Sequence, residues 1–370
     1  MHRRFQSVWS DSRARHPPTR SGLLPKGYEV FESFPRAPGA TFSFELYPPR
    51  SPAAEASLSE AVDRLIAVKP QFVSVTYRPT GRDRAASLAV LNRLIREHKV
   101  PAMAHLTCVG SSFEEASRVI REFLDAGVTS FLALRGDPPD GAGEGAGKDA
   151  GEDAGEGAGR RQGQGEVDGG DFLGDFRSAG ELVQLIHSVQ AERSPFSFQE
   201  VPGFPTAKRL RSGDKVTIAV ATFPNGHPRS RSRTQDIDTL LAKEAAGANL
   251  AITQLFFHAD EYQSFVQEAR TAGVTMRILP GIMPVVSVAR LHRMLELSGE
   301  ATPRALLAAL ESAPDAATAS RLGIEACIQL ADDLLAGVAD GIHLYTFNRA
   351  EAPLAVLRGA GLLAATNQSA

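Results

Sequence analysis

Short apolar segments alternate along this chain with longer segments in which apolar residues recur at helical spacing. Segments of about five residues predict strands, and the longer periodic ones predict amphipathic helices. Regular alternation of the two is typical of a parallel sheet whose faces are covered by helices. The eight predicted strands are Thr41–Leu46, Phe72–Thr76, Ala102–Leu106, Ser130–Arg135, Val216–Thr222, Asn249–Gln254, Arg277–Ile282 and Gly341–Tyr345.

Helix boundary signals support the alternation. Ser112 and Glu115 form a Ser-x-x-Glu capping box in front of an apolar periodic segment, and Gly127 follows that segment. Gly247 and Gly273 likewise follow periodic segments, each just before a predicted strand. These glycines are expected to end helices, so that every predicted helix leads directly into the next strand.

The eight strands predict a single-domain (β/α)8 TIM barrel rather than an open dinucleotide-binding sheet. An open sheet of that kind would carry G-x-G-x-x-G after its first strand, whereas here the strand is followed by Tyr47-Pro48-Pro49. In a barrel, the loops at the carboxyl ends of the strands form the active site. The residues expected to become neighbours there are Glu45, Thr76, His105, Asp137, His227, Gln254 and Arg349.

Three segments interrupt this organisation. Residues 1–36 are basic and lack apolar periodicity, and we interpret them as a disordered tail, with a nucleic-acid-binding arm as the less favoured reading. Residues 140–170 are Gly, Ala, Glu and Asp with almost no apolar side chain, which predicts a flexible loop inside the barrel domain of residues 37–370. Residues 196–214 contain Pro and Gly and are also predicted to form a loop.

Composition narrows the class of partner. The chain has 40 basic and 43 acidic residues, a formal net charge of −3, so nothing global favours nucleic acid or a membrane surface. The two cysteines, Cys108 and Cys327, are far apart and are interpreted as core thiols. No apolar run is long enough to cross a bilayer, and no secretory signal is visible. We therefore expect a cytoplasmic protein with small-molecule partners.

Glu45 is the first candidate catalytic residue. It lies near the end of an apolar, aromatic segment that stops at two prolines. Removal of water from a carboxyl group raises its pKa, so we expect a raised pKa and proton donation near neutral pH. The alternative is a buried glutamate paired with an arginine, because acids are seldom buried unless they are paired.

The other candidates follow later strands. Asp137 ends Arg135-Gly136-Asp137, where Gly136 permits close approach of a ligand, although the same residues are typical of a simple turn. His105 could bind a ligand or be a satisfied core histidine. No second ligand at metal-binding spacing accompanies it, so no metal is expected. His227 follows Pro-Asn-Gly and, read alone, is structural.

Gln254 completes the candidate set. Its amide is followed by Leu-Phe-Phe, a combination suited to the edge of a flat heterocycle. A strand-end amide bonded to backbone is an equally open interpretation when this residue is considered by itself.

Together, these motifs resemble methylenetetrahydrofolate reductase over nearly everything from Thr41 onward. The motifs that carry the resemblance, in the family's order, are Phe-Glu-x-x-Pro-Pro, Val-Thr-Tyr, Ala-His-Leu-Thr-Cys, Leu-Arg-Gly-Asp, Ala-Gly-Ala-Asn-x-x-Ile-Thr-Gln-x-Phe-Phe, Pro-Gly-Ile-Met-Pro-Val and His-x-Tyr-Thr-x-Asn-Arg. The resemblance implies an FAD-dependent enzyme of one-carbon and methionine metabolism. FAD would take a hydride from NADH or NADPH and pass it, in a ping-pong reaction, to 5,10-methylenetetrahydrofolate, giving 5-methyltetrahydrofolate. The resemblance does not indicate whether NADH or NADPH is preferred. It also leaves the oligomeric state open, and a homo-oligomer is possible.

The resemblance also assigns roles to residues. Glu45 matches the family's general acid, and Asp137 matches a carboxylate near both pterin and flavin. Positions matching substrate contacts are Gln254, Arg290, Met294 and Arg349. Positions matching flavin contacts are Thr76, His105, Arg135, Gly136, Asp137, Phe223, His227, Asp236 and Lys243.

Several residues depart from the family pattern. Phe223 stands where many relatives have Tyr, and Asn225 replaces a frequent Glu, so flavin affinity could differ. Arg78-Pro79 replaces small residues, and Met294 replaces a Phe that contacts folate in some relatives, with less stacking. Two rival functions follow: another flavin-dependent barrel, such as a proline-dehydrogenase-like enzyme, and a non-catalytic folate- or flavin-binding relative. The presence of both Glu45 and Asp137 argues against the second.

Overall fold

The computed structural model describes most of the chain from Gly39 onward. The described residues are 39–77, 81–107, 110–136, 174–193, 198–201, 204–210 and 216–363. The predicted tail of residues 1–36 and the predicted loop of residues 140–170 lie outside them.

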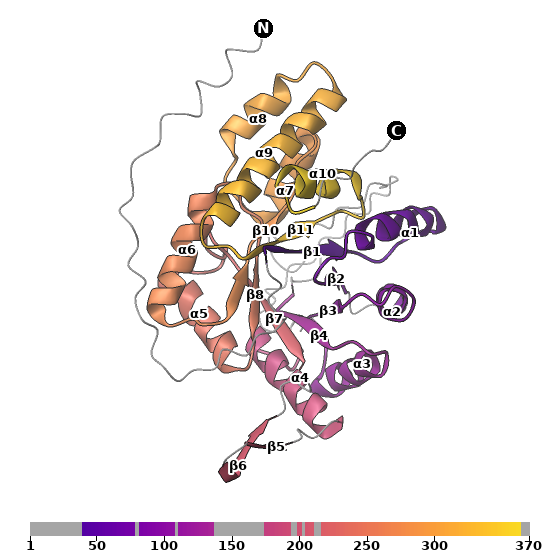
Figure 1. Ribbon diagram of the computed structural model, residues 1–370, viewed down its shortest axis with the longest axis vertical. Coiled ribbons are helices and arrows are strands. Elements are labelled where there is room, and N and C mark those ends of the chain that lie inside the picture. Colours follow the sequence, from indigo (N-terminus) through magenta and orange to yellow (C-terminus); the bar gives the residue numbers. More distant parts are fainter. Residues whose placement is uncertain are drawn as a thin grey trace, which may run out of the picture. The chain divides into compact units, whose positions relative to one another are not determined.

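Nine parallel strands form one nearly closed barrel, with helices around its outside (Figure 1). Their order is β10-β11-β1-β2-β3-β4-β7-β8-β9, and one residue, Pro280, separates β9 from β10 along the chain. The two ends of the sheet therefore meet, which confirms the predicted TIM barrel. The strands are β1 (Thr41–Leu46), β2 (Val73–Val75), β3 (Ala102–Thr107), β4 (Ser130–Leu134), β7 (Thr217–Thr222), β8 (Leu250–Thr253), β9 (Arg277–Leu279), β10 (Gly281–Ile282) and β11 (Gly341–Tyr345).

The predicted strand Arg277–Ile282 is divided at Pro280. Proline has no backbone N–H and cannot donate to a neighbouring strand. Its carbonyl still accepts from the N–H of His343 at 2.8 Å, and the N–H of Gly281 turns to the hydroxyl of Thr253, also at 2.8 Å. β9 therefore pairs with β8 and β10 with β11, so this divided strand is the place where the barrel closes.

The predicted helix boundaries are confirmed. Ser112 and Glu115 form the expected capping box, and Gly127, Gly247 and Gly273 follow helices with φ of +94°, +114° and +103°. The helices are α1 (Pro52–Ile66), α2 (Gly81–Asn92), a π-helical turn η1 (Arg93–Glu97), α3 (Phe113–Asp125), α4 (Ala179–Arg193), α5 (Arg233–Ala245), α6 (Ala259–Ala272), α7 (Val288–Ser298), α8 (Arg304–Glu311), α9 (Ala316–Ala336) and α10 (Glu351–Gly359).

The prediction of a loop at residues 196–214 is wrong. β5 (Phe198–Val201) and β6 (Phe204–Leu210) form an antiparallel hairpin, which projects beyond α4 in Figure 1. The sequence contains a turn signal, since Pro202-Gly203 separates two short segments with β-branched and aromatic residues. Prolines and glycines were given too much weight as signs of irregular structure.

The core has separate layers inside and outside the barrel. The outer layer packs helices against strands, as Leu65, Ile120 and Phe265 illustrate, and these side chains are fully or almost fully buried. A smaller cluster fills the interior, so the barrel is a packed core and not a channel. Its buried members are Phe72, Met103, Leu132, Ala219, Leu250, Ile252 and Leu279. A third cluster, which includes Met294 and Leu310, joins α7 and α8 to the carboxyl end of the barrel.

Arg277 connects several strands at the amino end of the barrel. Its guanidinium pairs with Asp340 at 2.8 Å and donates to the side chains of Gln71 at 2.8 Å and Thr41 at 2.6 Å. These partners lie at or just before the starts of β11, β2 and β1. One side chain therefore holds the last strand against the first, on the opposite side of the barrel from the carboxyl-end loops.

Replacing Gly323 with alanine is expected to destabilise the protein by about 2 kcal/mol. A Cβ on Gly323, in α9, would overlap the backbone carbonyl of Val285, which follows β10. Alanine favours a helix by about 1 kcal/mol over glycine, but forced overpacking costs about 3 kcal/mol. A denaturant titration measures the difference; a Gly323→Ala protein more stable than the parent would show that α9 moves away without cost.

Candidate active site

A carboxylate and two imidazoles meet at the carboxyl end of the barrel. Glu45 comes from β1, His105 from β3 and His343 from β11. Oε2 of Glu45 is 3.6 Å from Nε2 of His105 and 3.9 Å from Nε2 of His343. Both imidazoles are buried, whereas 23% of the Glu45 side chain is exposed. The carboxyl group of Glu45 therefore contacts the two histidines on its buried side and is accessible on the other.

His343 was not predicted as a site residue. Its Nδ1 is 2.8 Å from the hydroxyl of Ser43, directly across the β1–β11 pairing, and its ring stacks on Phe72 with 5.7 Å between centroids. The sequence signal was available in His-x-Tyr-Thr-x-Asn-Arg, where the histidine lies inside an apolar strand two residues before Tyr345. Only the pairing of the first and last strands brings it to Glu45.

The expected rise in the pKa of Glu45 is contradicted. Burial does raise the pKa of this carboxyl, but its interactions with the imidazoles of His343 and His105 act in the opposite direction and outweigh it. The pKa of Glu45 therefore lies below its ordinary value. Burial also lowers the pKa of His105 to about 4, against the effect of Glu45, so His105 is neutral at neutral pH. The residues around Glu45 in the sequence indicate its desolvation, but the two histidines come from other strands.

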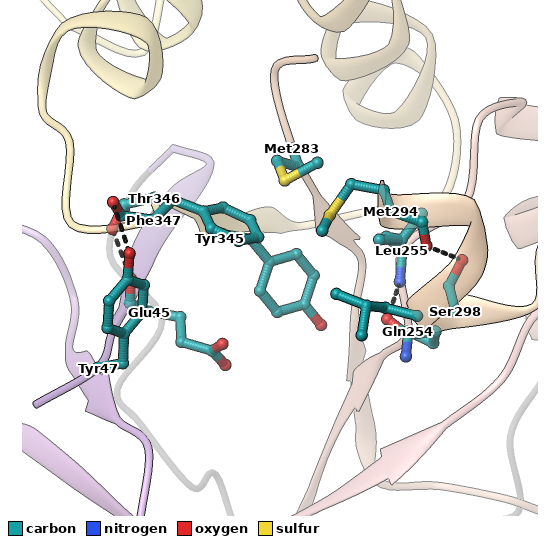
Figure 2. A pocket seen from close by; sticks show the side chains of 11 residues that line it. Glu45, Tyr47, Gln254, Leu255, Met283, Met294, Ser298, Tyr345, Thr346 and Phe347 are labelled. Carbon is teal, nitrogen blue, oxygen red and sulfur yellow. Dashed lines mark hydrogen bonds between the residues drawn. The ribbon is translucent and has the colours of Figure 1, made fainter. Parts of the chain in front are cut away.

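A pocket of about 190 Å³ opens beside Glu45. Figure 2 shows Glu45 on one side and Gln254 on the other, with the ring of Tyr345 between them. Most of the remaining wall is apolar or aromatic, a surface suited to a flat ring system. The lining residues are Glu45, Tyr47, Gln254, Leu255, Met283, Met294, Leu297, Ser298, Tyr345, Thr346 and Phe347. The predicted residues Glu45, Gln254 and Met294 thus share one cavity.

Two polar side chains of the pocket are held by backbone groups. The hydroxyl of Tyr345 donates to the carbonyl of Thr253 at 2.7 Å, which ties β11 to β8. Burial and the nearby Glu45 raise the pKa of Tyr345 well above its usual range, so its hydroxyl stays protonated. The side-chain carbonyl of Gln254 accepts from the N–H of Leu255 at 2.8 Å. The NH2 group of Gln254 is therefore the end of the amide that can donate to a ligand.

The loop after β11 has an unusual backbone. Phe347 and Asn348 both have positive φ, +51° and +57°, a conformation that non-glycine residues rarely adopt. Asn348 accepts from the N–H of Tyr47 at 3.0 Å and donates to its carbonyl at 2.9 Å. The Tyr47 hydroxyl donates to the carbonyl of Phe347 at 3.2 Å. These bonds fasten the loop after β11 to the segment after β1 and place Phe347 in the pocket wall.

The two predicted substrate-side arginines lie near this loop but do not line the pocket. The guanidinium of Arg290, on α7, lies 4.5 Å from the ring centre of Phe347. The N–H of Arg349 donates to the carbonyl of Thr346 at 3.0 Å, just before α10. The positive charge of Arg290 therefore stands beside the wall that Phe347 forms, where an anionic extension of a ligand could reach it, and Arg349 follows the same loop.

The predicted flavin contacts lie on adjacent strands. Thr76 follows β2, His105 is in β3, and Arg135 and Gly136 follow β4. Gly136 has φ of +83°, which lets a ligand approach the backbone. Within the described ranges, the hydroxyl of Thr107 and Nε2 of His105 are buried without a hydrogen-bond partner. Such atoms cost about 1–3 kcal/mol each unless a ligand satisfies them, so these residues fit a polar cofactor.

The remaining predicted flavin contacts gather around α5. Asp236 accepts from the N–H of His227 at 3.3 Å, and Lys243 donates to the carbonyl of Ala221 at 2.7 Å. Burial lowers the pKa of Lys243 to about 8, although Asp236 acts in the opposite direction. Phe223 meets His227 edge to face, with 4.7 Å between centroids. The structure thus keeps this group together in the loop after β7, the strand next to β4, and on α5.

Some predicted features lie outside the described residues. These include Asp137, Cys108 and the departure at Arg78. Cys327 is described and is a buried free thiol, with its pKa raised to about 12 by burial. Over the described ranges, no three His, Cys, Asp or Glu side chains are arranged to hold a metal ion, and no helix has the length and hydropathy needed to span a membrane.

Comparisons with known proteins agree on one family. The family model described as methylenetetrahydrofolate reductase matches residues 31–154 and 171–361. The chain is 28% identical to 5,10-methylenetetrahydrofolate reductase of Salmonella typhimurium, over 86% of this chain and 90% of that protein. It is 29% identical to methylenetetrahydrofolate reductase (NADH) 1 of Zea mays, over 90% of this chain but 51% of that protein. The chain thus spans about half the length of the plant relatives that it matches.

A solved structure shares the fold at low sequence identity. A Clostridium thermocellum protein, described as binding two copies of 5-methyl-5,6,7,8-tetrahydrofolic acid, superposes with a TM-score of 0.55 at 12% identity, over 88% of this chain and 95% of that one. That likeness concerns the fold alone. The family match covers all the strands and helices described above. The chain belongs to the methylenetetrahydrofolate reductase family.

Proposed function

We propose that this protein reduces 5,10-methylenetetrahydrofolate to 5-methyltetrahydrofolate, with FAD as cofactor and NADH or NADPH as the source of the hydride. Membership of the family supports the reaction class. The observation that carries the proposal is the pocket, in which a half-buried carboxylate and an amide face a mainly apolar cavity at the carboxyl end of the barrel.

Glu45 is proposed as the general acid. Opening of the bridged folate requires a proton on a ring nitrogen, and Glu45 is the carboxyl group that lines the pocket. The role is compatible with a lowered pKa, because a general acid needs only to be protonated in the reacting complex and to lie within reach of the nitrogen. Excluding water on binding the folate disfavours the carboxylate and shifts Glu45 toward its protonated form.

The pocket walls are proposed to bind the folate ring system. Met294, Leu255 and Phe347 supply apolar surface, and the Gln254 NH2 group supplies a hydrogen-bond donor. Arg290 and Arg349 are proposed to attract the anionic glutamate portion of the substrate, since Arg290 lies over the Phe347 ring and Arg349 follows the same loop. Asp137 is proposed to act beside the pterin and the flavin, as the family resemblance implies.

FAD is proposed to lie across the carboxyl ends of β2, β3, β4 and β7. When bound there, a flavin would supply the two-electron chemistry that protein side chains lack, accepting a hydride from the nicotinamide and donating it to the folate. His105, Thr76, His227 and Lys243 are proposed to hold its polar groups. The unsatisfied atoms of Thr107 and His105 support a polar occupant at this edge.

An absorbance experiment tests the proposed function. The purified protein, with FAD added if necessary, is mixed anaerobically with NADH and, separately, with NADPH, and then with methylenetetrahydrofolate. We expect a flavin spectrum that bleaches with at least one nicotinamide and returns with the folate, with one 5-methyltetrahydrofolate formed per flavin. Comparison of the two bleaching rates gives the nicotinamide preference.

Each failure has its own meaning. Folate binding without turnover would favour a non-catalytic relative. Bleaching that proline or another amino acid causes, and that NAD(P)H does not, would favour the proline-dehydrogenase-like alternative. A protein that binds no FAD would refute the cofactor assignment and would point to the substitutions at Phe223 and Asn225.

A further inference from the structure

His343 is fully buried and does not line the pocket, but its imidazole faces Glu45, which does. One ring nitrogen meets the Ser43 hydroxyl at 2.8 Å, and the other faces Oε2 of Glu45 at 3.9 Å without a hydrogen-bond partner of its own within the described residues. The ring is held between Phe72, which stacks on it, and Tyr345, which meets it edge to face. The imidazole therefore has one orientation available.

We propose that His343, fixed by Ser43, is a positioning residue that holds the carboxyl of Glu45 and sets the pH range in which that carboxyl carries a proton. The inference rests on the proposed function, in which the proton of Glu45 is transferred to the folate. It assigns to His343 a task that requires no contact with substrate or cofactor.

The other titratable groups that act on Glu45 do not replace His343. Among described residues these are His105 from β3 and Tyr345 from β11, while β2 contributes the neutral Ser74 opposite Glu45 in register. Tyr345 stays protonated, and the lowered pKa of His105 leaves that ring uncharged near neutral pH. The interaction with His343 is then the main one favouring the charged form of Glu45.

Ser43 determines which nitrogen of His343 carries the hydrogen. If the Ser43 hydroxyl donates to Nδ1, the hydrogen of a neutral ring lies on Nε2 and is directed toward Glu45. A carboxylate favours that arrangement because the positive end of the N–H is directed at it, whereas the other tautomer would oppose two lone pairs. Loss of Ser43 should therefore weaken the same interaction that loss of His343 removes.

The test uses His343→Phe, Ser43→Ala and the conservative His343→Gln. Phenylalanine keeps a ring to stack on Phe72, and glutamine keeps an N–H donor. Ser130→Ala is the matched control, since Ser130 is also a buried strand serine but lies at the amino end of β4. Glu45 is titrated directly by infrared spectroscopy, with its carboxyl band isolated by subtracting the spectrum of Glu45→Gln. The folate half-reaction is followed over the same pH range.

Removing His343 leaves the burial of Glu45 but removes the facing imidazole, which favours its charged form, so the pKa of Glu45 should rise. We expect the protonated-carboxyl band to persist to higher pH in His343→Phe, and less so in Ser43→Ala. The decline of folate reduction with rising pH should shift in the same direction. A displaced carboxyl should also lower kcat by about 10- to 100-fold with little change in the KM for folate. His343→Gln should recover part of both effects, and Ser130→Ala should show neither.

The outcomes separate this inference from the proposed function. A Glu45 band that titrates at the same pH in parent, His343→Phe and Ser43→Ala would overturn the role of His343, whether or not the protein reduces folate. Because Ser43→Ala removes a single oxygen, it decides the matter even if His343→Phe does not fold. Absence of 5-methyltetrahydrofolate formation by the parent protein would refute the proposed function, while the infrared titration would still decide the interaction of His343 with Glu45.

Discussion

Replacing Glu45 with glutamine should lower the rate of folate reduction by about 10²- to 10⁴-fold, the usual contribution of a general acid. Glutamine has nearly the same shape but no proton to give. The bleaching of bound flavin by NAD(P)H should change little, because that half-reaction needs no proton from Glu45. Stopped-flow measurement of the two half-reactions in the same preparation separates these effects.

Glu60→Gln is a suitable control, because it makes the same chemical change on an exposed position of α1. It should leave both half-reactions intact. Equal loss of the two half-reactions in Glu45→Gln, accompanied by a lower melting temperature, would show that Glu45 supports the structure and is not the acid.

Replacing Arg277 with methionine should destabilise the folded protein by about 3 kcal/mol. The substitution removes the pairing with Asp340 and the hydrogen bonds to Gln71 and Thr41. Each is worth about 1 kcal/mol net, since water can reach part of the vacated Asp340, whose side chain is 35% exposed. The midpoint of urea unfolding should fall at an unchanged m-value.

Arg321→Met provides the comparison for Arg277. Arg321 makes an exposed pair with Glu325 one turn along α9, and such pairs contribute about 0.5 kcal/mol or less. Similar effects of the two substitutions would mean that the contacts of Arg277 do not hold the first and last strands together. The Arg277→Met protein should otherwise retain its pocket, which lies at the opposite end of the barrel.

Local sequence patterns were sufficient for the barrel strands and for most helix ends. β1 and β11 begin and end at the predicted residues, because strand and turn signals act over a few neighbouring positions. The predictions were wrong where residues farther apart in sequence determine the local structure. Pro280 divides a segment that looked continuous, and Pro202-Gly203 separates two strands where a loop was expected.

The site was only partly predictable for the same reason. Glu45 and Gln254, predicted from strand ends, and Met294, given by the family resemblance alone, line one pocket. The direction of the pKa shift of Glu45 was wrong because its partners come from β3 and β11. His343 is separated from Ser43 by 300 positions, so no local window contains both.

The contacts between β1 and β11 have a consequence for how activity is acquired. Ser43 with His343, and Tyr47 with Asn348, are pairs 300 and 301 positions apart. Contacts between such distant residues form late, because closing a long loop costs entropy before the contact repays it. The groups proposed to hold FAD lie between these ends of the chain. During refolding, we therefore expect the proposed flavin site to form before the proposed acid, Glu45, acquires its partners in the step that joins the ends of the barrel.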